Sequence, residues 1–113
     1  MNTFSFNKYR QPFWAVEMPD KDGTVLHIVP PTVDLQEELR ASAADFNALL
    51  AGGNADKRAA LYDLAARLMS CNRDLLKITA EDLRKTYDID TEDLVGFFQG
   101  YVDFIRGIEN AKN

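Results

Sequence analysis

The sequence predicts an α+β fold, in which an N-terminal β-hairpin precedes a bundle of about four helices. Apolar residues alternate in two short stretches before residue 30, as they do in half-buried strands. Pro30 and Pro31 then end the β region, because neither can donate a hydrogen bond to a sheet. Beyond them, apolar residues recur three and four apart, which is the spacing of amphipathic helices. We therefore expect one domain over residues 1–113, with a β region over residues 1–30 and a helical body over residues 32–113.

Length, composition and charge bound the class of protein. The chain has 113 residues, of which 46% are hydrophobic and 27% charged, as in soluble single domains. Its net charge is −5 and its Lys and Arg residues are scattered, which argues against binding to nucleic acid. No apolar run approaches the roughly 18 residues that a membrane span needs. The N-terminus lacks the pattern of a secretory signal and Cys71 is the single cysteine, so we expect a cytoplasmic protein.

The hairpin is expected over residues 13–18 and 24–29, which both show the alternation of a strand. One face of the first stretch carries Trp14, Val16 and Met18. Two sets compete for the inward face of the second stretch: Leu26 with Ile28, or Val25 with His27 and Val29. Gly23 ends the connecting loop and can take the positive φ that closes it. Phe4 and Phe6 alternate with polar residues, which leaves a third short strand open.

The helical body is expected to begin with a helix from Thr32 or Asp34, the two candidate N-caps, to Ala51. Its inward face carries Leu35, Leu39, Phe46, Leu49 and Leu50. A second helix is expected from about Asn54 or Ala55 to Asn72. Its inward residues are Leu61, Leu64, Ala65, Leu68 and Met69. A short helix over residues 79–86 and a final helix from residue 90 both begin with the spacing of a capping box.

The final helix is the most apolar part of the chain. Its central stripe consists of Leu94, Phe98, Tyr101, Ile105 and Ile108. Phe97 and Phe104 extend this stripe on one flank, and Val95 and Val102 extend it on the other. The resulting apolar arc covers roughly half of the helix, whereas a surface helix needs a stripe only somewhat wider than about 100°. This helix therefore either lies deep between neighbours or has one flank left for another chain.

The opposite face of the final helix carries Gly96, Gly100 and Gly107. Each glycine inside a helix costs about 1 kcal/mol relative to alanine. Two interpretations remain open, namely close packing within the domain or a groove for a partner helix. The aromatic residues Phe13 and Trp14 are further candidates for partner binding, because a small sheet cannot easily cover both of its faces.

Residues capable of enzyme or metal chemistry lack the partners that they need. His27 is the only histidine and has no acid or cysteine at ligand spacing. Arg73 would lower the pKa of the Cys71 thiol if it lay close, but no histidine is near Cys71 in sequence. The acids around Asp90 and Asp93 fit helix capping better than a calcium loop. We predict no catalytic residues, no metal site and no cofactor.

Three segments, taken in chain order, form a pattern. The hairpin is followed by Pro30-Pro31-Thr32-Val33; a middle segment carries Asn72-Arg73-Asp74, Lys77, Thr79 and Glu81-Asp82-Leu83; the last helix carries Asp93-Leu94, Phe98, Tyr101 and Phe104-Ile105. This pattern resembles the tail assembly chaperones of long-tailed phages and prophages. Leu75 departs from it, because the family has glycine there, and the turn is expected to differ.

The resemblance implies a non-enzymatic protein that binds the tape-measure protein and helps to recruit tail-tube subunits in the bacterial cytoplasm. Such a protein is expected to self-associate along its client. From the residues, we predict that the binding surface includes Phe97, Phe104, Gly96, Gly100, Phe13 and Trp14. The alternative is a prophage-encoded adaptor module that binds another protein through the edge of the hairpin.

Overall fold

The computed structural model describes residues 12–42 and 55–111. Its elements are, in chain order, β1 (Trp14–Glu17), β2 (Val25–Ile28), α1 (Val33–Ala41), α3 (Ala55–Met69), η1 (Asp82–Thr86) and α4 (Thr91–Ala111). The predicted α+β arrangement, a two-stranded antiparallel hairpin followed by about four helices, is confirmed. The third strand considered at Phe4 and Phe6 lies outside the described residues, as do Phe46, Leu49 and Leu50.

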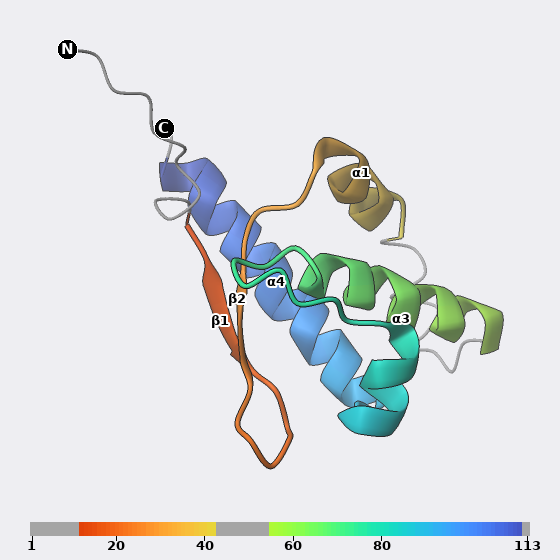
Figure 1. The fold of residues 1–113 in the computed structure, drawn as a ribbon. Helices are drawn as coiled ribbons and strands as arrows, with labels where there is room; N and C mark the ends of the chain where they lie inside the picture. Colours follow the sequence, from red (N-terminus) through yellow and green to blue (C-terminus); the bar gives the residue numbers. More distant parts are fainter. Residues whose placement is uncertain (1–11, 43–54, 112–113) are drawn as a thin grey trace.

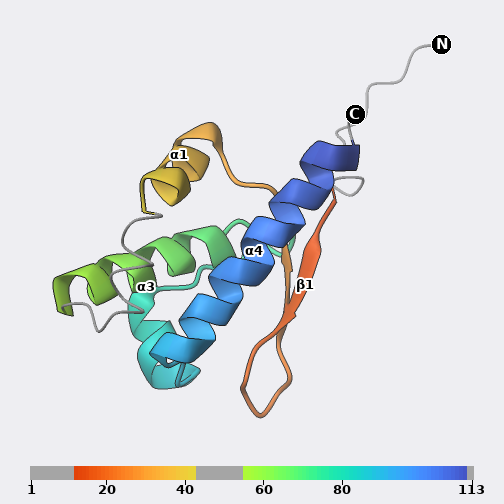
Figure 2. The same cartoon turned by 180° about the vertical axis from the view of Figure 1, so that it is seen from behind.

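Helix α4 crosses the molecule diagonally, with the hairpin beside it and α3 packed against it (Figure 1). The view from behind shows α4 in front, with the hairpin on one side and α1 and α3 on the other (Figure 2). Leu94, Phe98 and Tyr101 of its central stripe are buried, and Ile105 is half-buried. The prediction that this stripe faces the core is therefore confirmed for these residues.

The hairpin pairs Trp14 with Ile28 and Val16 with Leu26. Leu26 and Ile28 are fully buried, which decides between the two sets predicted for the inward face of β2. In the connecting loop Gly23 has a φ of +63°, as the loop prediction required. The carboxylate of Asp20 accepts a hydrogen bond of 2.8 Å from the backbone N–H of Thr24 and so ties the two ends of the loop together.

The second edge of β2 is covered by the segment that follows α3. The backbone N–H of Val29 donates to the carbonyl of Cys71 at 2.9 Å, and that of Arg73 donates to the carbonyl of His27 at 3.0 Å. Between them Ile28 and Asn72 form an antiparallel bridge. This pairing was not predicted, because the segment that supplies it shows no strand alternation of its own.

Asn72 shapes the turn that returns the chain from this edge. Its buried side-chain amide donates to the carbonyls of Met69 and Leu76, both at 2.8 Å. Its Oδ1 accepts from the N–H of Leu76 at 3.0 Å. These bonds end the second predicted helix at Met69 rather than at Asn72. They enclose Leu75, which takes a φ of +59° and leaves 83% of its surface exposed.

The starts of the helices follow the capping signals in the sequence. Thr32, rather than Asp34, caps α1, because its hydroxyl accepts from the N–H of Leu35. Thr79 and Asp82 exchange hydrogen bonds between side chain and backbone before η1, which is a π-helical turn. Asp90 and Asp93 do the same at the start of α4. None of the described helices is long and apolar enough to cross a membrane.

Candidate functional site

The aromatic flank of α4 that was predicted to meet a partner is covered by the hairpin. The indole of Trp14 stacks on Phe97 and on Phe104, with ring centroids 5.5 and 6.2 Å apart. It also lies edge-on to Tyr101 at 6.3 Å. Phe97 is buried and Phe104 is half-buried. Trp14, Phe97 and Phe104 therefore form a contact between β1 and α4.

The glycines of α4 separate into two groups. A Cβ built on Gly100 would lie 2.7 Å from Cζ2 of Trp14, so this position admits no side chain unless the indole moves. Gly100 therefore fits the first interpretation, close packing within the domain. A Cβ at Gly96 or Gly107 would have no described neighbour within 4 Å. These two glycines lie open on the face of α4 that is turned away from the core.

The outer face of the sheet carries Phe13, which is 42% exposed. The guanidinium carbon of Arg73 lies 3.8 Å from the centre of the Phe13 ring, and His27 meets the same ring edge-on. Nδ1 of His27 lies 3.2 Å from a carboxylate oxygen of Asp74. No acid lies at ligand spacing from His27 in the sequence, and the turn around Asn72 brings this acid, which is 47 residues away, next to it.

Tyr101 is fully buried and Cys71 is half-buried, and both are titratable. Burial raises the pKa of the Cys71 thiol, which corrects the idea that Arg73 would lower it. Its Sγ contacts the carbonyl of Arg67 at 3.6 Å. Burial also raises the pKa of Tyr101, with a further contribution from Cys71. Within the described ranges no three His, Cys, Asp or Glu residues are grouped so as to hold a metal ion.

A groove of about 410 Å³ lies between α1 and the C-terminal half of α4. Its lining residues are Gln36, Leu39 and Arg40 from α1 and Val102, Ile105, Arg106 and Glu109 from α4. The apolar floor therefore uses Val102, which belongs to the flank of α4 opposite to Phe97 and Phe104. Its position depends on where α1 lies, so the apolar pattern of α4 alone did not single it out.

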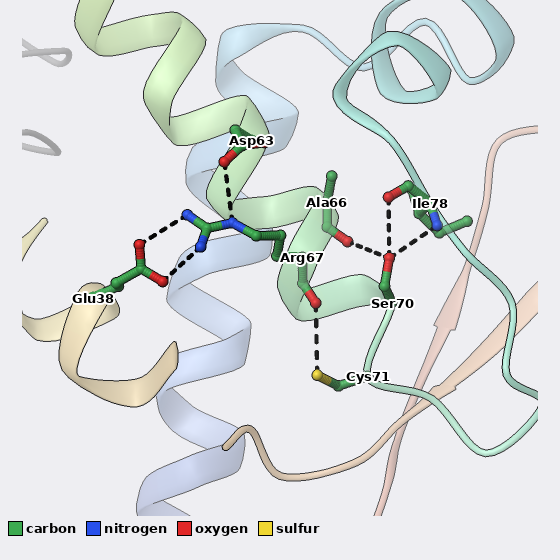
Figure 3. Close-up of polar contacts among 7 residues, drawn as sticks. All are labelled: Glu38, Asp63, Ala66, Arg67, Ser70, Cys71 and Ile78. Carbon is green, nitrogen blue, oxygen red and sulfur yellow. Dashed lines mark hydrogen bonds and ion pairs between the residues drawn. The ribbon is translucent and has the colours of Figure 1, made fainter. Parts of the chain in front are cut away.

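The wall formed by α1 is held in place by a polar contact with α3 (Figure 3). The guanidinium of Arg67 donates to both carboxylate oxygens of Glu38, at 2.6 and 3.0 Å. Its Nε lies 3.0 Å from the carboxylate of Asp63. The hydrogen bonds with Glu38 contribute most to raising the pKa of Arg67. This two-pronged pairing fixes the orientation of α1 relative to α3 as well as their distance.

The lining of the groove includes two arginines from different helices, Arg40 of α1 and Arg106 of α4. Within the described part of the chain, neither Arg40 nor Arg106 has an acidic group within ion-pair distance. Glu109, the acidic residue of the lining, has an interaction partner of its own. The groove thus combines an apolar floor with positive charge at its edges.

Comparison of the chain with protein-family models, with curated proteins and with solved structures gives no match.

Proposed function

We propose that the protein is a non-enzymatic tail assembly chaperone of a phage or prophage, which binds the tape-measure protein and helps to recruit tail-tube subunits. The motifs around residues 30–33, 72–83 and 93–105 supply the resemblance on which this proposal rests. The structural observation that favours it is the groove between α1 and α4. An apolar groove with helical walls is a common receptor for an amphipathic helix.

The groove is suited to a client that must later be released. Its floor consists of a few aliphatic side chains, Leu39, Val102 and Ile105, and its rim is polar. Burial of apolar area contributes about 25 cal/mol per Å². A small contact of this kind binds one helical segment weakly, and several copies along a long client would bind it firmly through avidity. Self-association along the client is accordingly part of the proposal.

The proposal is tested by light scattering coupled to size-exclusion chromatography. Purified full-length protein is mixed with overlapping helical segments that cover the tape-measure protein encoded nearby. We expect at least one segment to co-elute with the protein at the mass of a complex. A protein that stays monomeric and forms no complex with any segment would contradict the proposed function.

Two valine variants locate the contact. Val102 lines the groove and does not belong to the core cluster, whereas Val33 at the start of α1 is 72% exposed and lies outside the groove. Val102→Asn is expected to abolish co-elution and Val33→Asn to retain it. Both changes replace the same side chain by the same polar one, so a difference between them reports the groove rather than general polarity.

A second candidate function is the adaptor module that binds through the hairpin. In the described part of the chain β1 pairs only with β2, which leaves the outer edge of β1 open to a further strand. The exposed Phe13 and Val25 lie in or beside the hairpin. In that case a partner would contact the sheet, and Val102→Asn would bind it as well as the unaltered protein does.

A further inference from the structure

We infer that the groove between α1 and α4 receives an amphipathic helix of another protein, in which acidic side chains border the apolar stripe. The inference deepens the proposed function and rests on it, since it names the chemistry of the client segment. It is carried by the shape of the walls, by Arg40 and Arg106 on the rim, and by the surfaces that the described helices present.

The walls select a helix over an extended peptide. The lining residues recur three or four apart on each wall, from Gln36 to Arg40 on α1 and from Val102 to Glu109 on α4. Both walls therefore present side chains, while their backbone N–H and C=O groups are bonded within each helix. An extended peptide would find few main-chain partners there, whereas a helix satisfies its own backbone. A third helix can also set its ridges between those of α1 and α4.

The rim selects acidic neighbours for that helix. Arg40 and Arg106 stand on opposite walls, and no described carboxylate lies within ion-pair distance of either. Arginine pairs with carboxylates through two parallel hydrogen bonds, which fixes geometry as well as charge. The lining holds two arginines and one glutamate, an excess of one positive charge in a chain of net charge −5. Complementary charge sets the choice and register of a partner more than its affinity.

The described helices do not themselves supply such a segment. The exposed large apolar residues of the described chain are Phe13, Val25, Val33, Leu75 and Leu76. Of these, Val33 alone lies in a helix, so no described helix presents an apolar stripe that would fill the groove of a second copy. Among the described helices no candidate occupant is found, and we assign the groove to a segment of a different protein on the charge of its rim; a second copy is an outcome of the test.

The test uses two fluorescein-labelled synthetic helices with the same leucine stripe, bordered by Glu in one and by Lys in the other. Fluorescence anisotropy measures their binding to the full-length protein at low and at physiological salt. We expect the Glu-bordered helix to bind at least about tenfold more tightly, equivalent to about 1.4 kcal/mol. Salt should reduce this advantage, because exposed charge pairs are screened.

Substitution of the two arginines tests whether the rim causes the preference for the Glu-bordered helix. Arg106→Glu is expected to remove the preference for the Glu-bordered helix, and Arg40→Gln, which leaves no negative charge at the end of α1, to weaken it. Arg58→Glu is the matched control, because Arg58 is an exposed arginine of α3 outside the groove. Circular dichroism establishes whether each variant is folded. If Arg106→Glu does not fold, the binding of the two helices to Arg40→Gln tests whether the rim sets the preference.

Several outcomes would overturn the inference. They are equal affinity for the two helices, a preference that Arg106→Glu leaves unchanged, no binding of either helix, or a dimer of the protein alone that Val102→Asn abolishes. The last would mean that a second copy fills the groove. If a tape-measure segment co-elutes but the two helices bind alike, the proposed function stands and this inference fails. If Arg106 governs helix binding but no tape-measure segment co-elutes, the proposed function fails and the chemistry of the groove stands.

Discussion

The indole of Trp14 lies directly on the backbone of Gly100, so close that a Cβ at this glycine would be 2.7 Å from Cζ2. The same ring stacks on Phe97 and on Phe104. One contact thus joins the hairpin to the longest helix. It also covers the aromatic flank of α4 and leaves the flank with Val102 for the groove beside α1.

Gly100→Ala should destabilise the protein, although alanine is the better helix former. Overpacking of this kind costs about 1–3 kcal/mol, which exceeds the gain of about 1 kcal/mol in helix propensity. Gly96→Ala and Gly107→Ala are the controls, and each should stabilise the protein because no described atom opposes the new methyl group. Urea unfolding measures all three, and a stabilising Gly100→Ala would contradict the packing described.

Leu75→Gly should stabilise the protein. Leu75 holds a φ of +59°, a conformation that costs an L-residue about 1–2 kcal/mol and costs glycine little. Its side chain is 83% exposed, so little packing is lost. Part of the gain is offset by the greater freedom of glycine in the unfolded chain. We expect a net gain of about 0.5–1 kcal/mol in the free energy of unfolding. The control Leu76→Gly, at a residue without positive φ, should lower stability. Equal effects of the two changes would argue against a left-handed conformation at residue 75.

Tyr101→Phe and Tyr62→Phe should change the free energy of unfolding by different amounts or in opposite directions. The Tyr101 hydroxyl is buried, and no group in the described ranges accepts its hydrogen bond. The Tyr62 hydroxyl donates to the carbonyl of Ile89 at 2.6 Å. Removing the first hydroxyl should leave the free energy of unfolding unchanged or raise it, and removing the second should lower it by about 1 kcal/mol. Thermal melts of both variants measure this, and a larger loss at Tyr101 would mean that its hydroxyl has a partner.

Glu38→Gln should reduce the affinity for a helical peptide, while it changes the free energy of unfolding only slightly. Glu38 and Arg67 are both about half exposed, so their ion pair is worth no more than about 1 kcal/mol of stability. The same pair orients α1, which carries one wall of the groove. The control is Glu37→Gln, at an exposed neighbour on α1. If both variants bind a helical peptide as tightly as the unaltered protein does, the pair does not position the wall.

The sequence was most informative where the cause of a structure is local. The caps at Thr32, Thr79 and Asp90 and the glycine that closes the hairpin loop each act within a few residues, and all of them appear in the structure. The pairing of Ile28 with Asn72 and the contact of His27 with Asp74 join segments more than 40 residues apart. No periodicity within either segment encodes such a pairing.

The candidate site was predicted in part for the same reason. The wide apolar arc of α4 left open whether the helix lies deep between neighbours or has one flank for another chain, and Phe97 and Phe104 were the candidates on that flank. The hairpin supplies Trp14 to cover that flank, and α1 turns the other flank into a groove. Both facts depend on tertiary packing, which the pattern of one helix does not contain.

The most direct test of this account is site-specific photocrosslinking to a tape-measure segment. Benzoylphenylalanine is placed at Gln36 on the rim of the groove, or at Ala15 on the exposed face of the sheet as a control. The account predicts a crosslinked product from position 36 and none from position 15. A crosslink from position 15 without one from position 36 would contradict it and would move the binding surface to the hairpin.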